Sequence, residues 1–165
     1  GFFMRYAENM LLSRNLLSAI SIGLVLSYAL LSGAWVSTGD AWYRALRQPA
    51  WQPPDVVFGL IWPYNFIVLG IAGFVVTQRA STQVGLAWNF VLLISVIAAI
   101  TWAYQFYVPH HLLIAAVSLL IGALSTIGLL IIIWPQSTLL FWLLIPYQLW
   151  LLTATSLSFG YWHLN

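Results

Sequence analysis

The sequence contains no cysteine and very little charge. Of its 165 residues, only 5% are Asp, Glu, Lys or Arg, whereas 62% are hydrophobic. The absence of cysteine excludes disulfides, thiolate metal sites and cysteine nucleophiles. A soluble domain would carry charge on about a quarter of its residues, because its surface must be hydrated. We therefore predict an all-α, multi-pass integral membrane protein whose first partner is the lipid bilayer.

The few charged residues are also too dispersed to form a functional cluster. The five arginines are scattered along the chain, so we predict no surface for nucleic acid. The only acids are Glu8, Asp40 and Asp55, and all three lie outside the apolar runs. A proton relay or coupled-ion site normally shows as an ionisable residue inside the membrane. Proton-driven or ion-driven transport is therefore disfavoured.

Three histidines are the remaining candidates for chemistry. His110 and His111 are adjacent, so their side chains diverge in an extended loop, and His163 would emerge on the same side of the membrane. We expect solvated histidines at the interface rather than a metal site. Ser, Thr and His form no nucleophile motif. We therefore predict no catalytic residue, no metal and no required cofactor, and we favour a protein that is not an enzyme.

Five apolar runs are each long enough to span a bilayer as a helix, which takes about 20 residues. We expect one domain over residues 1–165, a bundle of five transmembrane helices with its termini on opposite sides. The first four residues are left out of the fold prediction, and residues 5–14 are interpreted as a short amphipathic lead-in. No cleavage site of small residues marks the first run as a signal peptide, so it is expected to be retained. The predicted helices cover residues 16–36, 53–77, 84–107, 112–133 and 138–162.

Residues 37–52 form the longest polar connection. Loops in a compact bundle are usually short, so a long one is a candidate lid over a site. The alternative is an interfacial amphipathic segment anchored by Trp42 and Tyr43, and both interpretations can hold. Pro53-Pro54-Asp55 follows the loop and reads as a helix start, because proline and an acid are both favourable in a first turn.

Large aromatic residues recur at helical spacing in three of the predicted helices. Packing or lipid contact is the common role of such stripes. Prolines on two of these helices can bend the backbone around a cavity, and the long loop lies over the same end, which favours a ligand pocket. Facing indoles would suit a flat conjugated ligand. The stripes comprise Trp51, Phe58, Trp62 and Phe66; Trp102, Gln105 and Phe106; and Tyr147, Trp150, Ala154, Ser158 and Tyr161.

The fourth predicted helix differs, because it carries small residues at spacings of three and four. Such a face permits close approach of another helix. Contact within the bundle is one interpretation, and a homodimer face is the other. The residues are Ala115, Ser118, Gly122 and Ser125.

Several blocks of the sequence carry a family resemblance. They are Trp42-Tyr43, Leu46, Pro49, Trp51, Pro53-Pro54, Phe58-Gly59, Trp62 and Gly70; then Trp102 with Phe106-Tyr107; then Pro146-Tyr147, Trp150, Ala154, Trp162, Leu164 and Asn165. Together they resemble the TspO/MBR family, the tryptophan-rich sensory proteins related to the mitochondrial translocator protein, from about residue 35 to the C-terminus.

The resemblance implies a five-helix bundle, usually dimeric, with a pocket beneath the first loop. That pocket accepts porphyrins such as protoporphyrin IX and haem, and in some members sterols. Roles proposed for the family include porphyrin or sterol transport, regulation of tetrapyrrole metabolism, and light-dependent porphyrin breakdown. The pocket assignments carry over to Trp42, Trp51, Pro53, Pro54, Phe58, Trp62, Trp102, Phe106, Tyr147, Trp150 and Ala154.

Three positions depart from the family pattern. Phe66 stands where the family has Tyr, and Ala99 and Ser158 each stand where it has Asn. Several polar groups of the pocket are therefore missing, and each lost hydrogen bond would weaken the binding of a polar ligand by about 1 kcal/mol. The resemblance thus implies a divergent member with a more apolar pocket.

Three functional hypotheses follow from the residues and the resemblance. The first is a membrane protein that binds a tetrapyrrole or another flat apolar, porphyrin-like or sterol-like molecule, with Trp51 and Trp150 as stacking walls and the Trp42 loop as a lid. The second is an enzyme of porphyrin photo-oxidation, which the lack of an acid–base group in the pocket disfavours. The third is a structural or assembly subunit of a larger membrane complex. Homodimerisation is compatible with all three.

Overall fold

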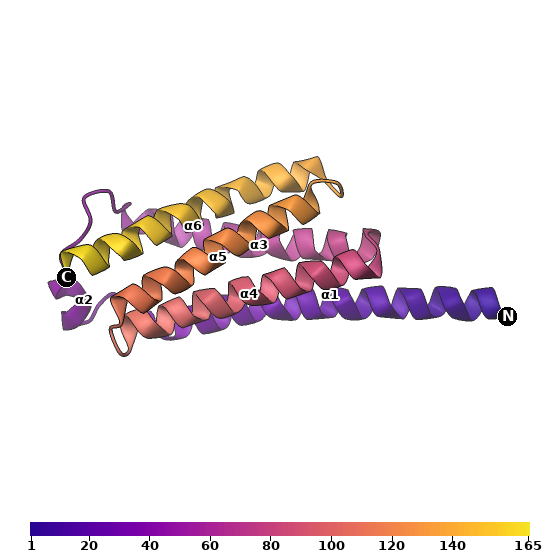
Figure 1. The fold of residues 1–165 in the computed structure, drawn as a ribbon, viewed down its shortest axis with the longest axis horizontal. Helices are drawn as coiled ribbons and strands as arrows, with labels where there is room; N and C mark the ends of the chain where they lie inside the picture. Colours follow the sequence, from indigo (N-terminus) through magenta and orange to yellow (C-terminus); the bar gives the residue numbers. More distant parts are fainter.

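The chain folds into six helices without any strand. A computed structural model describes all 165 residues (Figure 1). Five of the helices are long and apolar enough to cross a membrane, which confirms the predicted all-α, five-span fold. The two termini lie at opposite ends of the bundle, as an odd number of spans requires. The helices are α1 (Phe2–Ala34), α2 (Ala41–Ala45), α3 (Asp55–Arg79), α4 (Thr82–Tyr107), α5 (Leu112–Ile133) and α6 (Thr138–Leu164).

Helix α1 is much longer than the predicted span of 16–36. It includes three of the four residues left out of the prediction, with Gly1 at the N-cap, and the lead-in 5–14, because no proline or glycine between residues 2 and 15 interrupts a helix. Its 33 residues extend about 50 Å, whereas the hydrocarbon core is about 30 Å thick. Burial begins only at Leu17. The N-terminal part of α1 therefore projects past the other helices (Figure 1).

Other helix ends shift by a few residues. Pro53 and Pro54 precede α3 rather than open it, with Pro54 in the N-cap position. The predicted polar loop of 78–83 shrinks to two residues, because the Ser81 hydroxyl accepts a hydrogen bond from the Val84 backbone N–H and caps α4 at 3.2 Å. Helices α3 and α6 each continue through an internal proline, Pro63 and Pro146.

The two halves of α3 differ in how closely other helices approach them. At Gly73, a Cβ atom would lie 2.0 Å from the Ser21 hydroxyl oxygen of α1 and 2.9 Å from the Trp88 indole nitrogen of α4. Only glycine fits where three helices meet this closely. The interior of the bundle around Gly73 is therefore tightly packed.

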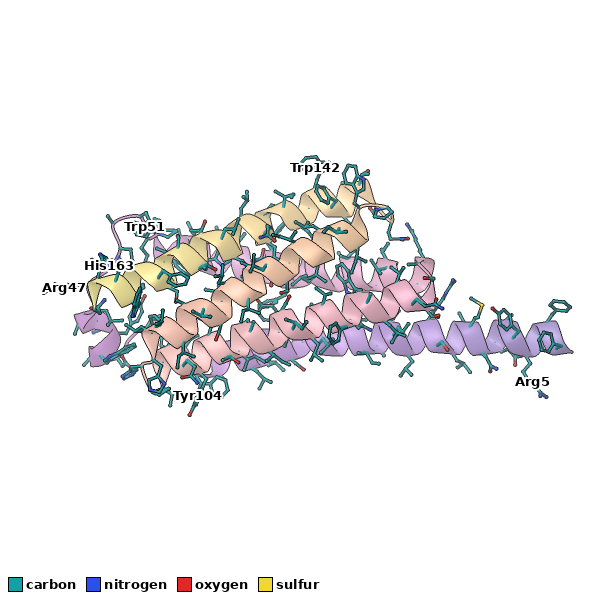
Figure 2. All side chains as sticks on the ribbon, viewed as in Figure 1. Arg5, Arg47, Trp51, Tyr104, Trp142 and His163 are labelled. Atoms are coloured by element: carbon teal, nitrogen blue, oxygen red, sulfur yellow. The ribbon has the colours of Figure 1, made fainter.

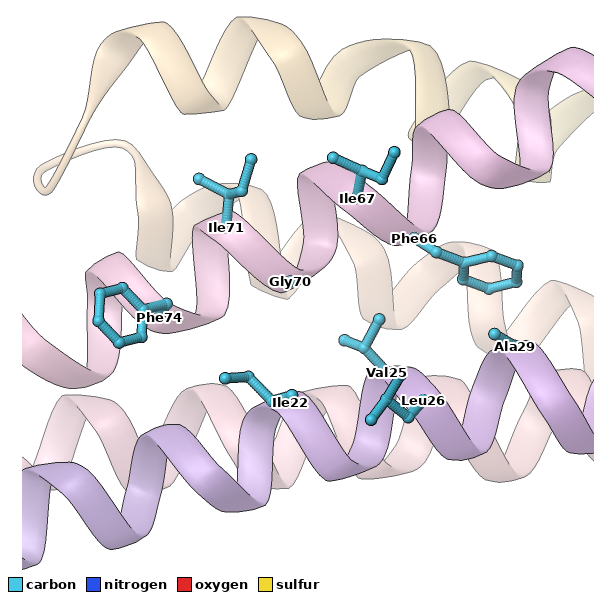
Figure 3. A pocket seen from close by; sticks show the side chains of 9 residues that line it. All are labelled: Ile22, Val25, Leu26, Ala29, Phe66, Ile67, Gly70, Ile71 and Phe74. Atoms are coloured by element: carbon cyan, nitrogen blue, oxygen red, sulfur yellow. The ribbon is translucent and has the colours of Figure 1, made fainter.

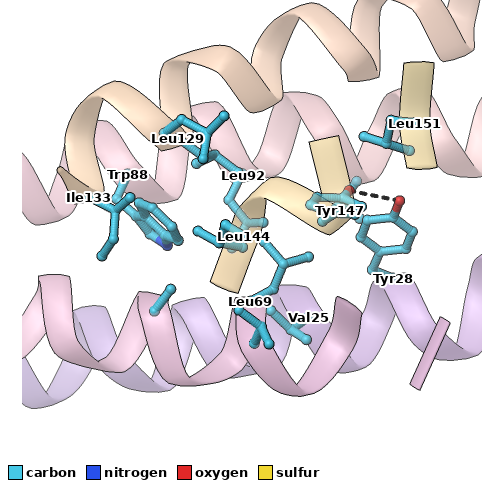
Figure 4. Packing of buried hydrophobic residues seen from close by; sticks show 14 of the residues in the cluster. Val25, Tyr28, Leu69, Trp88, Leu92, Leu129, Ile133, Leu144, Tyr147 and Leu151 are labelled. Carbon is cyan, nitrogen blue, oxygen red and sulfur yellow. Dashed lines mark hydrogen bonds between the residues drawn. The ribbon is translucent and has the colours of Figure 1, made fainter. Parts of the chain in front are cut away.

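Polar side chains link the helices within the core. The Tyr147 hydroxyl of α6 donates a hydrogen bond to the Tyr28 hydroxyl of α1 at 2.9 Å (Figure 4). The Gln148 side-chain amide donates to the Ala123 carbonyl of α5 at 3.0 Å, and the Asn89 amide of α4 donates to the Leu17 carbonyl of α1 at 3.0 Å. Such bonds satisfy polar groups where water is excluded, and they join helices far apart in the sequence.

The small-residue face of α5 packs against α4 of the same chain. Ala115, Ser118 and Gly122 are buried, and the Ser125 and Ser95 hydroxyl oxygens lie 2.5 Å apart. A Cβ atom at Gly122 would touch the Cβ of Ala98 on α4 at 3.6 Å. Within this chain the face therefore packs against α4, as the first interpretation predicts. The homodimer interpretation stays a prediction.

Candidate functional site

A cavity of about 620 Å³ lies inside the bundle, beneath the loop between α1 and α3. The C-terminal ends of α1, α4 and α6 and the N-terminal half of α3 surround it, so all of its walls come from the loop end of the molecule. Its volume falls within the range of about 300–1,000 Å³ that is usual for small-molecule sites. The chain therefore has room for a ligand where the sequence predicted one.

Aromatic side chains from three of the spanning helices, α3, α4 and α6, line the cavity. Trp62 and Phe66 of α3 lie nearly parallel, with ring centroids 5.6 Å apart and planes 25° apart. Trp150 of α6 meets Phe58 edge-on at 4.9 Å and Trp62 edge-on at 6.4 Å. These contacts fix the ring orientations, and they leave ring surfaces facing the cavity to receive a flat apolar molecule.

The end of the cavity nearest the loop is polar. The Tyr161 hydroxyl donates a hydrogen bond to the side-chain oxygen of Gln52, and the Gln52 amide donates to the Tyr43 hydroxyl at 3.4 Å. Asp55 also lines the cavity. The expectation that the pocket holds no acid–base group is therefore wrong, because the start of α3 brings one carboxylate to the rim.

The loop is fastened to α6 at several points along one side of that helix. Pro49 is buried against Gly160, where an added Cβ would lie 2.8 Å from the proline ring. The Trp51 indole N–H donates to the Ser156 hydroxyl at 3.1 Å. The Asn165 side chain forms two hydrogen bonds with the backbone of Arg47, at 2.9 and 3.0 Å. The loop therefore covers the cavity as a docked lid.

Trp42 lies on the other flank of the loop, in the short helix α2. Its ring stacks on the His110 ring, with centroids 3.6 Å apart and planes 4° apart, and it meets Phe106 edge-on at 5.6 Å. Asp40 caps α2 by accepting a hydrogen bond from the Tyr43 backbone N–H at 2.8 Å. The loop thus rests on the connection between α4 and α5 as well as on α6.

The structure brings together most of the predicted site residues. Those that line the cavity are Phe58, Trp62, Phe66, Ala99, Trp102, Phe106, Trp150, Ala154 and Ser158. Those that do not line it are Trp42, Trp51, Pro53, Pro54 and Tyr147.

The residues outside the cavity have other contacts. Trp51, predicted as a stacking wall, is 55% exposed and lies on α6 at the outer edge of the lid (Figure 2). Tyr147 is buried in the core, where its hydroxyl is hydrogen-bonded to Tyr28. Pro53 and Pro54 fix the entry into α3. Trp51 does not form the predicted wall because its indole N–H donates a hydrogen bond to Ser156 on the outer side of α6.

All three departures from the family pattern fall on the cavity wall, at Phe66, Ala99 and Ser158. The wall nevertheless retains unpaired polar groups. The indole nitrogens of Trp102 and Trp150 and the Ser158 hydroxyl are buried without a hydrogen-bond partner in the chain. Unpaired buried donors cost about 1–3 kcal/mol each, so a ligand with acceptor atoms would gain from reaching them.

Sequence reasoning missed one whole wall, which α1 supplies through Ala29, Ser32 and Gly33, followed by Val36 just past its end. Small residues at spacings of three and four were the available signal, since they leave space beside a helix. It also missed Tyr43 and Gln52, which reach the cavity from the loop.

The histidines do not converge. His110 stacks on Trp42, whereas the Nδ1 atom of His111 lies 2.9 Å from the Gln105 side-chain oxygen. No group of three or more His, Cys, Asp or Glu side chains is placed to hold a metal ion.

These features define a class: a multi-pass integral membrane protein with five spanning helices and an aromatic-walled cavity closed by its first loop. The profile of the TspO/MBR family matches residues 20–163, and the chain belongs to this family. It is 33% identical over 137 residues to the uncharacterized membrane protein YtaB of Bacillus subtilis, which covers 82% of this chain and 88% of YtaB.

Two further relatives carry descriptive names. The tryptophan-rich protein TspO of Bacillus cereus is 31% identical over 124 residues, covering 75% of this chain and 80% of that protein. The human translocator protein is 27% identical over 136 residues, covering 77% and 76%.

Proposed function

We propose that the chain binds a tetrapyrrole, such as protoporphyrin IX or haem, in the cavity beneath its first loop, and that it acts in transport or regulation of tetrapyrrole metabolism. The observation that carries the proposal is the aromatic wall contributed by three helices around about 620 Å³ of space. A planar, conjugated and largely apolar ligand gains both burial and ring contacts there. The name of the human relative, a translocator protein, is in keeping with a transport role.

The polar groups of the cavity support a ligand with hydrogen-bonding atoms at its edge. The unpaired indole N–H groups of Trp102 and Trp150 can donate to carbonyl or carboxylate oxygens. The hydroxyls of Tyr43 and Tyr161 lie at the loop end, where the polar edge of a tetrapyrrole would meet them. A purely aliphatic ligand would leave the two indole N–H groups unpaired.

Titration of the purified protein with protoporphyrin IX tests the proposal, with binding followed by the absorption of the porphyrin. We expect saturable binding by the wild type and about twofold to 12-fold weaker binding by Trp150→Ala, because an aromatic contact contributes about 0.5–1.5 kcal/mol beyond the area that it buries. Trp142→Ala is the matched control, since Trp142 lies on the same helix, is 62% exposed and does not line the cavity.

The outcome separates porphyrin binding from porphyrin photo-oxidation. Absence of saturable binding by the wild type would refute the proposal. Binding in the dark followed by conversion of the porphyrin spectrum in light would instead support the photo-oxidative enzyme. Equal binding by Trp150→Ala and Trp142→Ala would place the porphyrin outside the cavity.

A further inference from the structure

A second hollow lies on the outer face of the bundle, between α1 and α3 (Figure 3). This α1–α3 groove has a volume of about 440 Å³, and every side chain that lines it is apolar. Ile22 and Leu26 of α1 and Ile67 and Ile71 of α3 are all more than 40% exposed along it. In a membrane these residues face the acyl chains, so the groove is filled by lipid rather than by water.

The groove and the internal cavity share two residues. Ala29 of α1 and Phe66 of α3 line both hollows, so the hollows adjoin at these two side chains. Figure 3 shows Phe66 reaching from α3 toward the part of α1 that carries Ala29. Ala29 is small, so the Phe66 ring supplies most of the partition.

Nothing polar holds that partition in place. The Phe66 ring meets Tyr28 edge-on at 5.1 Å and lies beside Trp62 at 5.6 Å, and it has no atom able to form a hydrogen bond. Its movement requires only the exchange of one apolar contact for another. Since lipid is as apolar as the ring's present neighbours, opening toward the groove exposes no polar group to hydrocarbon.

The loop side is closed differently. Hydrogen bonds from Trp51 to Ser156 and between Asn165 and the Arg47 backbone fasten the lid to α6, and Pro49 is wedged against Gly160. A ligand that entered from the aqueous side would have to break these contacts together. A tetrapyrrole also partitions into the bilayer before it meets the protein.

We propose that the ligand enters the cavity sideways from the lipid, through the α1–α3 groove, with Phe66 as the gate between groove and cavity. This inference rests on the proposed function. It assigns the groove as a passage that an apolar ligand occupies in transit, and it gives Phe66 a role in the rate of binding in addition to its place on the wall.

Gly70 offers a way to block the groove without touching the cavity. It lines the groove only, and a Cβ atom there would meet nothing within 4 Å. Gly70→Leu should fill the groove, and Leu26→Trp should fill it independently from the α1 side. Gly59→Leu is the matched control, because Gly59 lies on the same helix, is equally free of neighbours and lines neither hollow.

The test compares rates with affinities. Each variant is placed in phosphatidylcholine nanodiscs and mixed with protoporphyrin IX in a stopped-flow instrument, with equilibrium titrations alongside. We expect Gly70→Leu and Leu26→Trp to slow association at least fivefold with an unchanged Kd, whereas Gly59→Leu matches the wild type. Phe66→Ala should speed association at least threefold.

Three outcomes are distinguishable from one another. If the wild type shows no saturable binding, the proposed function fails and the route fails with it. If binding is intact and both groove-filling variants associate as fast as Gly59→Leu, the route alone is overturned. If Asn165→Ala speeds association while the groove-filling variants leave it unchanged, entry is through the loop, which also overturns the route.

Discussion

Gly160→Ala is expected to lift the loop between α1 and α3 off α6. The new Cβ would lie 2.8 Å from one carbon of the Pro49 ring and 3.2 Å from the Trp51 ring. The proline ring cannot rotate away, because it is part of the backbone. The loop must therefore move as a unit, and movement separates the Trp51 indole from the Ser156 hydroxyl, which are now 3.1 Å apart.

The magnitude follows from the contacts that are lost. One hydrogen bond contributes about 1 kcal/mol, and partial exposure of buried Pro49 adds about another 1 kcal/mol. Alanine also raises the helix propensity of α6 by about 1 kcal/mol. That gain is present whether the loop is docked or free, so it does not oppose opening. A change of about 2 kcal/mol corresponds to about a 30-fold larger fraction of open loop.

Limited trypsin digestion measures this fraction, because the exposed residues Arg44 and Arg47 lie in the loop and cleavage requires the loop to open locally. We expect cleavage at these two sites to accelerate about 10-fold to 30-fold. Gly59→Ala, where an added Cβ meets nothing, is the control for helix propensity. Equal cleavage rates in the two variants would refute the docking of Pro49 on Gly160 as the contact that closes the lid.

Three further predictions concern the stability of the bundle in detergent, measured by thermal unfolding. Gly73→Ala places a Cβ 2.0 Å from the Ser21 hydroxyl and should lower stability by about 2–4 kcal/mol, whereas Gly70→Ala, which meets nothing, should not; equal melting temperatures would contradict the close approach. Asn65 is fully buried and neither of its amide atoms has a partner. Asn65→Leu should therefore raise stability by about 1–3 kcal/mol, and a loss would mean that the amide has a partner, such as a buried water. Gly122→Leu should lower the melting temperature by forcing α5 from α4 without changing the oligomeric state; an unchanged melting temperature with a lost dimer would support the homodimer interpretation instead.

The spanning helices were predictable from the sequence because their physical cause is local. Uninterrupted apolar runs of about 20 residues can satisfy their backbone groups in lipid only as helices. The errors lie at the ends. Residues 1–4 were left out of the fold prediction and residues 5–14 were interpreted as an amphipathic lead-in. Nothing between residues 2 and 15 ends a helix, however, and hydropathy alone does not report where helical hydrogen bonding stops.

The site was predictable in part, for the same reason. Phe58, Trp62 and Phe66 recur on one face of one helix, so spacing indicated that they share a surface. Spacing within a helix does not say which neighbour the surface meets. Trp51 does not lie on the predicted wall. Its hydrogen-bond partner, Ser156, is more than 100 residues away in the sequence, so spacing within one helix could not identify it.

The sequence by itself determined the class of solvent, the number of spans, the family and the aromatic character of the site, since each depends on composition or on short-range pattern. Only the tertiary structure decided which small residues face a partner helix and which face empty space. Gly73, Gly122 and Gly160 all receive close neighbours from other elements, whereas Gly70 opens onto a groove. A glycine permits close helix packing where another element approaches it and leaves a groove where none does. The approaching element comes from a distant part of the chain, so the local sequence does not decide between the two.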